Sequence, residues 1–242
     1  MMIHKTKGIV LHKIKYSESS VIAKIYTEQF GLQSYIIQGA AKKKAPVKNT
    51  LLQPLSLLDM VAYRKETAGL QRIKEMRLDS QFSTIPFDVN KSSVVLFLAD
   101  MLYKTIKEEE SNPAMFQFIE NTIKKLDEKQ TNATNFHLLF LVKLSKYLGF
   151  YPQGTYSITT CFFDLEEGVF CPHQPFHNNF LSNDLAKTLS QLLGTNFDNI
   201  DTLKISREQR KTILVKLIDF YRYHLANFGE VKSHEVLEEV LG

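Results

Sequence analysis

The first 80 residues alternate between apolar and polar positions with the period of two that is typical of β-strands. Val21, Ala23 and Ile25, for example, fall on one face of such a segment. Glycines and polar turns separate five segments of this kind, which cover residues 9–11, 20–27, 32–37, 51–64 and 70–78. Pro54 lies inside the fourth segment, where it predicts a bend at a β-bulge.

Five short strands within one small N-terminal region fit a closed β-barrel. The five-stranded OB-type barrel is the best-known barrel of this size, and it commonly binds oligonucleotides. We therefore expect an OB-type barrel. A strongly twisted SH3-like barrel is the main alternative.

Near residue 87 the apolar spacing changes to three and four, which is typical of α-helices. Asp88 or Asn90 is a candidate N-cap for the first helix, and Ser206 with Gln209 forms a capping box for a later one. The spacing predicts helices over residues 94–106, 113–126, 136–148, 184–193, 206–228 and 233–241. Residues 151–182 contain scattered Pro and Gly without a period, and we expect them to be irregular. The predicted fold is thus α+β, with an OB-type domain over residues 1–80 and an all-α domain with an irregular insertion over residues 81–242.

Charge is unevenly distributed along the chain. Residues 1–80 contain 14 Lys and Arg against 6 Asp and Glu, although the net charge of the whole chain is only +4. Residues 81–242 contain the other 16 Lys and Arg against 20 Asp and Glu, so they are mildly acidic. A basic end before a mildly acidic remainder points to a polyanionic partner. The alternative is that these lysines only keep a small β domain soluble.

The most basic stretch is the loop 39–48, which carries four lysines and no acid between two predicted strands. Basic side chains hold phosphates of a single strand, while aromatic rings stack on its bases. Candidate stacking residues are Tyr16, Tyr26, Tyr35 and Tyr63, although some of them must belong to the core. The candidate phosphate contacts are Lys13, Lys15, Lys24, Lys42, Lys43, Lys44, Lys48, Arg64, Lys65, Arg72 and Lys74. Such contacts predict salt-dependent binding with little preference for base sequence.

Four candidate zinc ligands, Cys161, Cys171, His173 and His177, lie within 17 residues. Structural zinc sites usually pair their ligands at short spacings such as C-x2-C, and this spacing fits that pattern poorly. Two ordinary thiols and surface histidines are the simpler interpretation. We therefore expect no zinc and no other cofactor.

Other sequence signals are negative. The chain lacks the G-x-x-x-x-G-K-[ST], G-x-G-x-x-G, H-E-x-x-H and G-x-S-x-G motifs, so we expect a protein that is not an enzyme. Its two cysteines do not form a disulfide framework, and its N-terminus lacks the apolar run of a signal peptide. No apolar run is long enough to cross a membrane. We expect a soluble cytoplasmic protein that has no membrane partner.

Several short segments, in order along nearly the whole chain, form a recognisable pattern. In the first half these are Gly8-Ile9-Val10-Leu11, Tyr16-Ser17-Glu18-Ser19-Ser20, Tyr26-Thr27, Gly31-Leu32, Gly39-Ala40 with the lysines that follow, and Leu51-Leu52-Gln53-Pro54-Leu55. In the second half they are Leu148-Gly149-Phe150-Tyr151-Pro152 and the segment from Phe228 to Leu237. Together these segments resemble the bacterial RecO family of DNA repair and recombination mediators. Many members carry a four-cysteine zinc motif, of which only Cys161 and Cys171 remain here.

The resemblance implies an N-terminal OB domain, a helical domain and no catalysis. It also implies a bacterial cytoplasmic protein that associates with the nucleoid during repair. It implies binding to single- and double-stranded DNA, annealing of complementary strands, and help in loading recombinase onto strands coated by single-stranded-DNA-binding protein. The implied protein partners are the R-type mediator and the acidic tail of single-stranded-DNA-binding protein. Candidate residues for that tail are Lys143, Lys146, Arg210 and Arg222. An RNA-binding OB module and a pure interaction scaffold remain as alternatives.

Overall fold

The computed structural model describes residues 2–18, 20–38, 49–64 and 69–241. The chain divides into two compact units, each built from two separate stretches of sequence. The first unit comprises Met1–Phe87 and Leu98–Asp127, and the second comprises Asp88–Phe97 and Glu128–Gly242. Helix α1, Val89–Thr105, contributes residues to both units.

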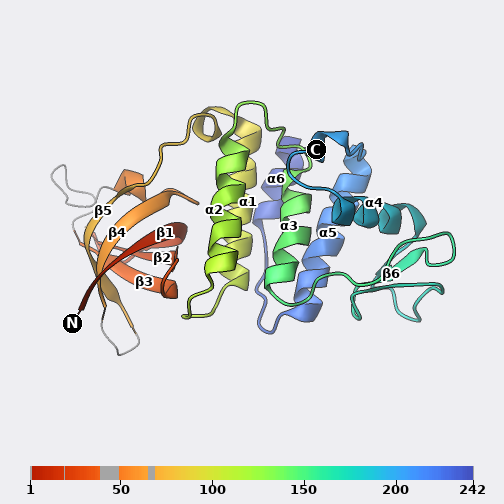
Figure 1. Ribbon diagram of the computed structural model, residues 1–242, viewed down its shortest axis with the longest axis horizontal. Coiled ribbons are helices and arrows are strands. Elements are labelled where there is room, and N and C mark those ends of the chain that lie inside the picture. The colour runs from red at the N-terminus through yellow and green to blue at the C-terminus, as the bar shows by residue number, and fades with distance from the viewer. Residues whose placement is uncertain (1, 19, 39–48, 65–68, 242) are drawn as a thin grey trace. The chain divides into compact units, whose positions relative to one another are not determined.

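The first unit is built on a closed five-stranded barrel (Figure 1). Its strands are β1 (Met2–Lys15), β2 (Val21–Thr27), β3 (Gly31–Ile37), β4 (Leu57–Arg64) and β5 (Gln71–Leu78). They close in the order β1-β2-β3-β5-β4, with β3 and β5 parallel and the other neighbouring strands antiparallel. This arrangement confirms the predicted OB-type barrel.

The inward faces of the strands form one apolar core. Ala23 and Ile25 contribute from β2 and Tyr35 from β3, as the period of two predicts. Val10 of β1 and Met60 of β4 pack against them. Because successive side chains of a strand point to opposite faces, the residues between these positions point outward.

A bulge in β1 changes which of its residues point outward. Val10 pairs with Ile25, but the next pair joins His12 to Lys24, so Leu11 is an extra residue on β1. The extra residue reverses the alternation of the strand. His12 therefore faces outward beside Lys24.

The expected fourth strand differs from the observed one. β4 begins at Leu57, and a short 3-10 helix, η1 (Asn49–Leu51), precedes it. The predicted bulge at Pro54 is wrong, because Pro54 lies before β4 begins. Besides the bulge in β1, the barrel has a register shift between β4 and β5, where Lys74 is the extra residue. Leu52 and Leu55 are fully buried, so their apolar character reflects core packing rather than strand structure.

Helix α2, Pro113–Asp127, covers part of the outward side of the barrel. Tyr26 of β2 is fully buried, its ring lies 5.9 Å from that of Phe116, and its hydroxyl donates to the Asn112 carbonyl. The segment that precedes α2 crosses the turn between β2 and β3. There the Leu32 amide donates to the Glu108 carbonyl over 2.9 Å.

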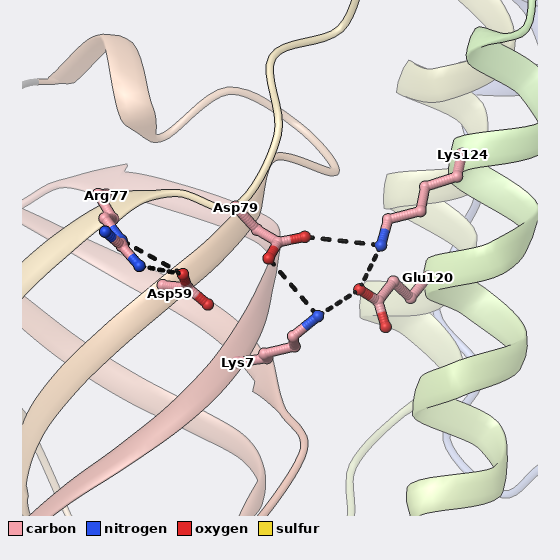
Figure 2. A network of polar contacts seen from close by, with 6 residues as sticks. All are labelled: Lys7, Asp59, Arg77, Asp79, Glu120 and Lys124. Carbon is pink, nitrogen blue, oxygen red and sulfur yellow. Dashed lines mark hydrogen bonds and ion pairs between the residues drawn. The ribbon is translucent and has the colours of Figure 1, made fainter.

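A network of ion pairs joins the same helix to the barrel (Figure 2). Lys7 of β1 lies 2.9 Å from Glu120 and 3.5 Å from Asp79, and Lys124 contacts both of these carboxylates. Although burial favours the protonated form of Glu120, hydrogen bonds from Lys124 and Lys7 lower its pKa. The hydrogen bond to Glu120 is the main cause of the raised pKa of Lys7. Two cations and two anions thus alternate between β1, α2 and the end of β5.

Asp127 at the end of α2 holds the segment that follows the barrel. Its carboxylate accepts hydrogen bonds from the amides of Ser83, Thr84 and Ile85. Burial acts to raise the pKa of Asp127, but these backbone donors lower it. The segment continues into the 3-10 helix η2, Ile85–Phe87.

The second unit packs its helices around α3, Phe136–Tyr147, which is buried on most of its surface. The other elements are α4 (Asn183–Gly194), η3 (Ile200–Thr202), α5 (Arg207–His224) and α6 (Ser233–Leu241). The Tyr221 hydroxyl of α5 donates to the Leu141 carbonyl of α3 over 2.7 Å. The predicted capping box of Ser206 and Gln209 is confirmed at the start of α5.

Two predictions for this unit are wrong. Residues 151–182 are not simply irregular, because they contain a small sheet of β6 (Phe162–Asp164), β7 (Val169–Cys171) and β8 (Phe180–Leu181) in the order β7-β6-β8. Helix α5 ends at His224 rather than at residue 228, and Asn227 just beyond it has a positive φ of 57°. In the described ranges no helix is both long enough and apolar enough to span a lipid bilayer.

We expect Gly31→Ala to destabilise the fold by about 2 kcal/mol or more. Gly31 has φ +61°, where an added Cβ costs about 1–2 kcal/mol, and that Cβ would also lie 2.3 Å from the Glu110 carbonyl oxygen. Urea unfolding followed by circular dichroism measures the loss. Gly194→Ala is the control, because nothing lies within 4 Å of that Cβ and it should leave stability nearly unchanged. Equal stability of the two variants would show that the turn does not require glycine.

Glu120→Gln should lower the stability of the fold at pH 7 by about 1 kcal/mol, since solvent screens the two lysines. The Glu120 pKa is lower in the folded protein than its ordinary value of 4.5. The stabilisation is therefore present above pH 4.5 and is lost as the pH falls through the folded pKa. Thermal melts of the parent and variant from pH 7 to pH 3 should converge at the acid end. The control is Glu109→Gln, a change at an exposed acid outside the network, and its melting temperature should equal that of the parent at every pH. A difference in melting temperature between Glu120→Gln and the parent that stays constant from pH 7 to pH 3 would contradict this account.

Candidate nucleic-acid interface

Three neighbouring strands of the barrel carry an outward surface that α2 does not cover. Lys24 of β2 lies opposite Ser34 of β3, and Ile36 of β3 lies between Ile22 of β2 and Arg72 of β5. All five side chains are at least partly exposed. We call this surface the β2–β3–β5 face and define it by Ile22, Lys24, Ser34, Ile36 and Arg72. Tyr63 of β4 lies opposite Arg72 and borders it.

Within the described residues, the basic side chains of this face have no acidic partners. Among the residues that the structure describes, no carboxylate forms an ion pair with Lys24 or Arg72. Their charges therefore remain available to an anion. A single strand held here would meet two cations and, at the border, the partly exposed ring of Tyr63. Cations with an aromatic ring are the combination that binds a phosphate backbone and its bases.

Other basic residues of the barrel are neutralised within the protein. Arg77 lies 3.0 Å from Asp59, and Lys74 lies 3.7 Å from Glu75. Lys74 was a predicted phosphate contact, and the register places it beside an acid. The outward side of β1, β4 and β5 is thus mixed in charge and attracts a polyanion less than the β2–β3–β5 face does.

The remaining predicted phosphate contacts are scattered. Lys13 is half-buried opposite Ala23, whereas Lys15 at the end of β1 is exposed. The Arg64 guanidinium lies 4.3 Å from the centroid of the Phe30 ring. The predicted contacts at residues 42, 43, 44, 48 and 65 lie outside the described residues.

Burial separates the four candidate tyrosines into two pairs. Tyr35 is buried inside the barrel and Tyr26 is buried between β2 and α2, so neither can stack on a base. Burial raises the pKa of Tyr35 to about 12, and it raises the pKa of Tyr26 as well. Tyr16 is 60% exposed and Tyr63 is partly exposed, so only these two remain as candidates for stacking.

The second unit contains a cavity of about 360 Å³ between α5 and α6. Arg207, Arg210 and Lys211 line it from α5, and three glutamates line it from α6, namely Glu235, Glu238 and Glu239. Lys211 is paired with Glu238 over 3.0 Å. Arg210 donates to the carbonyls of Ile205 and Leu241 and to the Asn135 side chain, all of which are neutral. Burial, followed by the positive charge of Arg207, lowers the Arg210 pKa.

His137 of α3 also reaches this cavity. Its side chain is 1% exposed, and its Nδ1 has no hydrogen-bond partner in the described part of the protein. Burial, followed by the charge of Arg210, lowers the His137 pKa to about 3, so the ring is neutral at pH 7. The sequence offered no signal for this position, because His137 is an isolated histidine on an apolar helix.

Of the four residues predicted to hold an acidic tail, Arg210 alone lines the cavity. Lys143 donates to the Leu193 carbonyl at the end of α4. Arg222 is paired with Asp219 one turn earlier on α5, and Lys146 is an exposed residue of α3. The structure therefore does not gather these four residues into one site.

The candidate zinc ligands do not fit a zinc site. The Cys171 thiol lies 3.3 Å from the His173 carbonyl, and burial, followed by the charge of Asp164, raises its pKa, which disfavours the thiolate that binds metal. His177 lies 3.2 Å from Asp164. Within residues 2–18, 20–38, 49–64 and 69–241, no three His, Cys, Asp or Glu side chains are placed to hold a metal ion. That the protein carries no zinc stays a prediction.

Family models match both parts of the chain. The N-terminal model of recombination protein O matches residues 1–82, and the C-terminal model matches residues 86–234. Curated relatives are similar over almost their whole length. The chain is 38% identical to the DNA repair protein RecO of Phocaeicola vulgatus over 239 residues, which cover 99% of each protein. It is 40% identical to the DNA repair protein RecO of Flavobacterium psychrophilum over 238 residues, which cover 98% of each.

The two family models together cover most of the chain, and they agree with the barrel and the helical unit seen in the structure. The relatives are 38% and 40% identical over nearly their full length. The chain belongs to the RecO family.

Proposed function

We propose that this protein is a non-enzymatic mediator of DNA repair and recombination. It binds single- and double-stranded DNA, anneals complementary strands, and helps load recombinase onto strands coated by single-stranded-DNA-binding protein. Its relatives bear the name DNA repair protein RecO, which supports the role in repair. The observation that supports DNA binding most strongly is the β2–β3–β5 face, where Lys24 and Arg72 have no acidic partner among the described residues.

The chemistry of this face suits annealing. A protein that anneals strands must hold DNA without occupying the base edges that will pair. Contacts from lysine and arginine to phosphates position the strand but do not read its sequence. They also reduce the repulsion between two phosphate backbones. The lysines at positions 42, 43, 44 and 48 remain proposed contacts of the same kind, next to the strands in sequence.

We place the acidic tail of single-stranded-DNA-binding protein at the cavity between α5 and α6. Arg207 and Arg210 supply positive charge on the α5 side of the cavity, opposite the three glutamates of α6, of which Glu238 is paired with Lys211. Leu214, Leu237 and Leu241 supply apolar lining. The unpaired Nδ1 of His137 offers one more polar contact. A short segment with carboxylates and an apolar end has matching chemistry. The R-type mediator is a second proposed partner, to which no surface is assigned.

We expect the double variant Lys24→Gln/Arg72→Gln to bind single-stranded DNA several-fold more weakly, by a similar factor for every base sequence. Two lost phosphate contacts should reduce the magnitude of the slope of log K against log salt by about 1.4, at about 0.7 for each contact. Fluorescence anisotropy with labelled oligonucleotides over a salt series measures both quantities.

The matched control is Lys5→Gln/Arg77→Gln, which removes the same charge from the outward side of β1 and β5, where acids are nearby. It should bind DNA nearly as the parent does. Equal loss in both double variants would indicate diffuse attraction rather than a defined face. Tighter binding of structured RNA than of DNA would favour an RNA-binding module. Absence of binding to either nucleic acid would favour a scaffold.

Arg207→Glu should weaken binding of an acidic peptide that ends in phenylalanine by about tenfold, or about 1.4 kcal/mol. The reason is that the change reverses an exposed charge at the cavity without removing the hydrogen bonds of Arg210. Titration of the labelled peptide measures the effect, and binding of DNA should be unchanged. Lys187→Glu on α4 is the control for charge. If the two variants lose peptide binding equally, the peptide binds elsewhere.

A further inference from the structure

The end of α1 adds a basic and aromatic surface to the barrel. The His12 ring of β1 stacks on the Tyr103 ring of α1, with centroids 4.5 Å apart and planes inclined by 13°. Lys24 lies directly across from His12 on β2. The Lys107 ammonium lies 5.5 Å from the centroid of the Tyr103 ring. All of these residues belong to the first compact unit.

Three lysines meet at this surface. The pKa of Lys107 is lowered, first by burial and then by the positive charges of Lys104 and Lys24. Since the three ammonium groups repel one another, an anion placed among them would be favoured. No described acid forms an ion pair with Lys24 or Lys104. We call the set Lys24, His12, Tyr103, Lys104 and Lys107 the His12–Tyr103 platform.

Glu108 is the acid next to the platform, and among the described residues it forms no ion pair with the platform lysines. Its carboxylate accepts a hydrogen bond from the Lys107 backbone amide, and its carbonyl accepts one from Leu32. It acts to raise the Lys107 pKa, but the combined effect of burial and the two lysines is larger. At Lys107 the effect of the two lysines is therefore larger than that of Glu108, although residues 108–110 are all glutamates.

Stabilisation of the end of a helix does not explain the whole arrangement. Lys104 lies in the last turn of α1, where a lysine interacts favourably with the helix dipole. The Lys107 ammonium, just beyond the helix, donates to the Tyr103 carbonyl over 3.2 Å. These contacts do not account for Lys24, which comes from a separate strand of the barrel. Nor do they account for an exposed histidine stacked on a tyrosine 91 positions later in the chain.

We propose that the platform is a second contact for single-stranded DNA, continuous with the β2–β3–β5 face through Lys24, and this inference rests on the proposed DNA-binding function. One phosphate lies among Lys24, Lys104 and Lys107. The neighbouring base stacks on the His12 ring, on the side away from Tyr103. Stacking of a base on an aromatic side chain tolerates every base, so the contact suits a protein that does not read sequence.

The platform also changes the expected extent of the DNA-binding region. Tyr103, Lys104 and Lys107 lie more than 20 residues beyond the last barrel strand in the sequence. A fragment that ends after β5 would contain Lys24 and His12 but not the other half of the site. Experiments on the platform therefore use the full chain.

The test compares oligo-dT binding by Lys104→Gln/Lys107→Gln with the charge-matched control Lys187→Gln/Lys204→Gln, whose residues are exposed in the second unit. The platform variant should bind several-fold more weakly, with a salt slope smaller in magnitude by about 1.4, and the control should bind like the parent. Thermal melting checks that both variants are folded. Equal binding by platform variant and control would overturn the phosphate contact.

The stacking contact has its own pair of variants. His12→Ala should weaken oligo-dT binding about fivefold or more, and His12→Phe, which keeps an aromatic ring, should restore most of it. If His12→Ala and His12→Phe bind oligo-dT with equal affinity, the base contact is overturned. If Lys24→Gln/Arg72→Gln loses binding and the platform variants do not, DNA binds the β2–β3–β5 face alone. If none of these variants loses binding, the proposed DNA surface of the barrel fails as well.

Discussion

On the outward side of β2, a buried tyrosine and a partly exposed lysine lie two positions apart. Tyr26 is a large aromatic that would expose its ring to water without α2, whereas Lys24, a proposed phosphate contact, can meet an anion only where solvent reaches it. The helix and the segment before it cover the first and stop short of the second. The ion pairs of Lys7 and Lys124 with Glu120 and Asp79 help to fix α2 in that position. The position of α2 therefore decides how much of the barrel can meet a ligand.

The barrel and most of the helices could be predicted because each follows a regular period over enough residues. The capping box of Ser206 marks its helix for the same local reason. The strands of the β6–β8 sheet are only two or three residues long, too short for any period to be visible. The end of α5 was missed because it depends on the backbone conformation near Asn227, and no glycine or proline at that point signals it.

The candidate site could be predicted only in part. Composition identifies the basic residues, but the strand register decides which of them are neutralised. Arg77 meets Asp59 through antiparallel pairing of β4 and β5, and Lys74 adjoins Glu75 within a bulge. Likewise, Tyr26 and Tyr63 look alike in sequence, and only packing shows that one is covered. Tyr103 and Lys107 were missed because they lie at the end of α1 and just after it, outside the segment whose charge drew attention.

The bulge at Leu11 has a consequence for how such a surface is encoded. Along β1 before the bulge, even-numbered residues face the core, and strict alternation would send His12 into the barrel. Because Leu11 is an additional residue in the hydrogen-bonded ladder, the residues of β1 after it that would point into the barrel point outward, and the reverse. The side chain that stacks on Tyr103 is thus presented by an interruption of the β pattern. Two relatives with the same residues but different bulge positions would present different surfaces to a ligand.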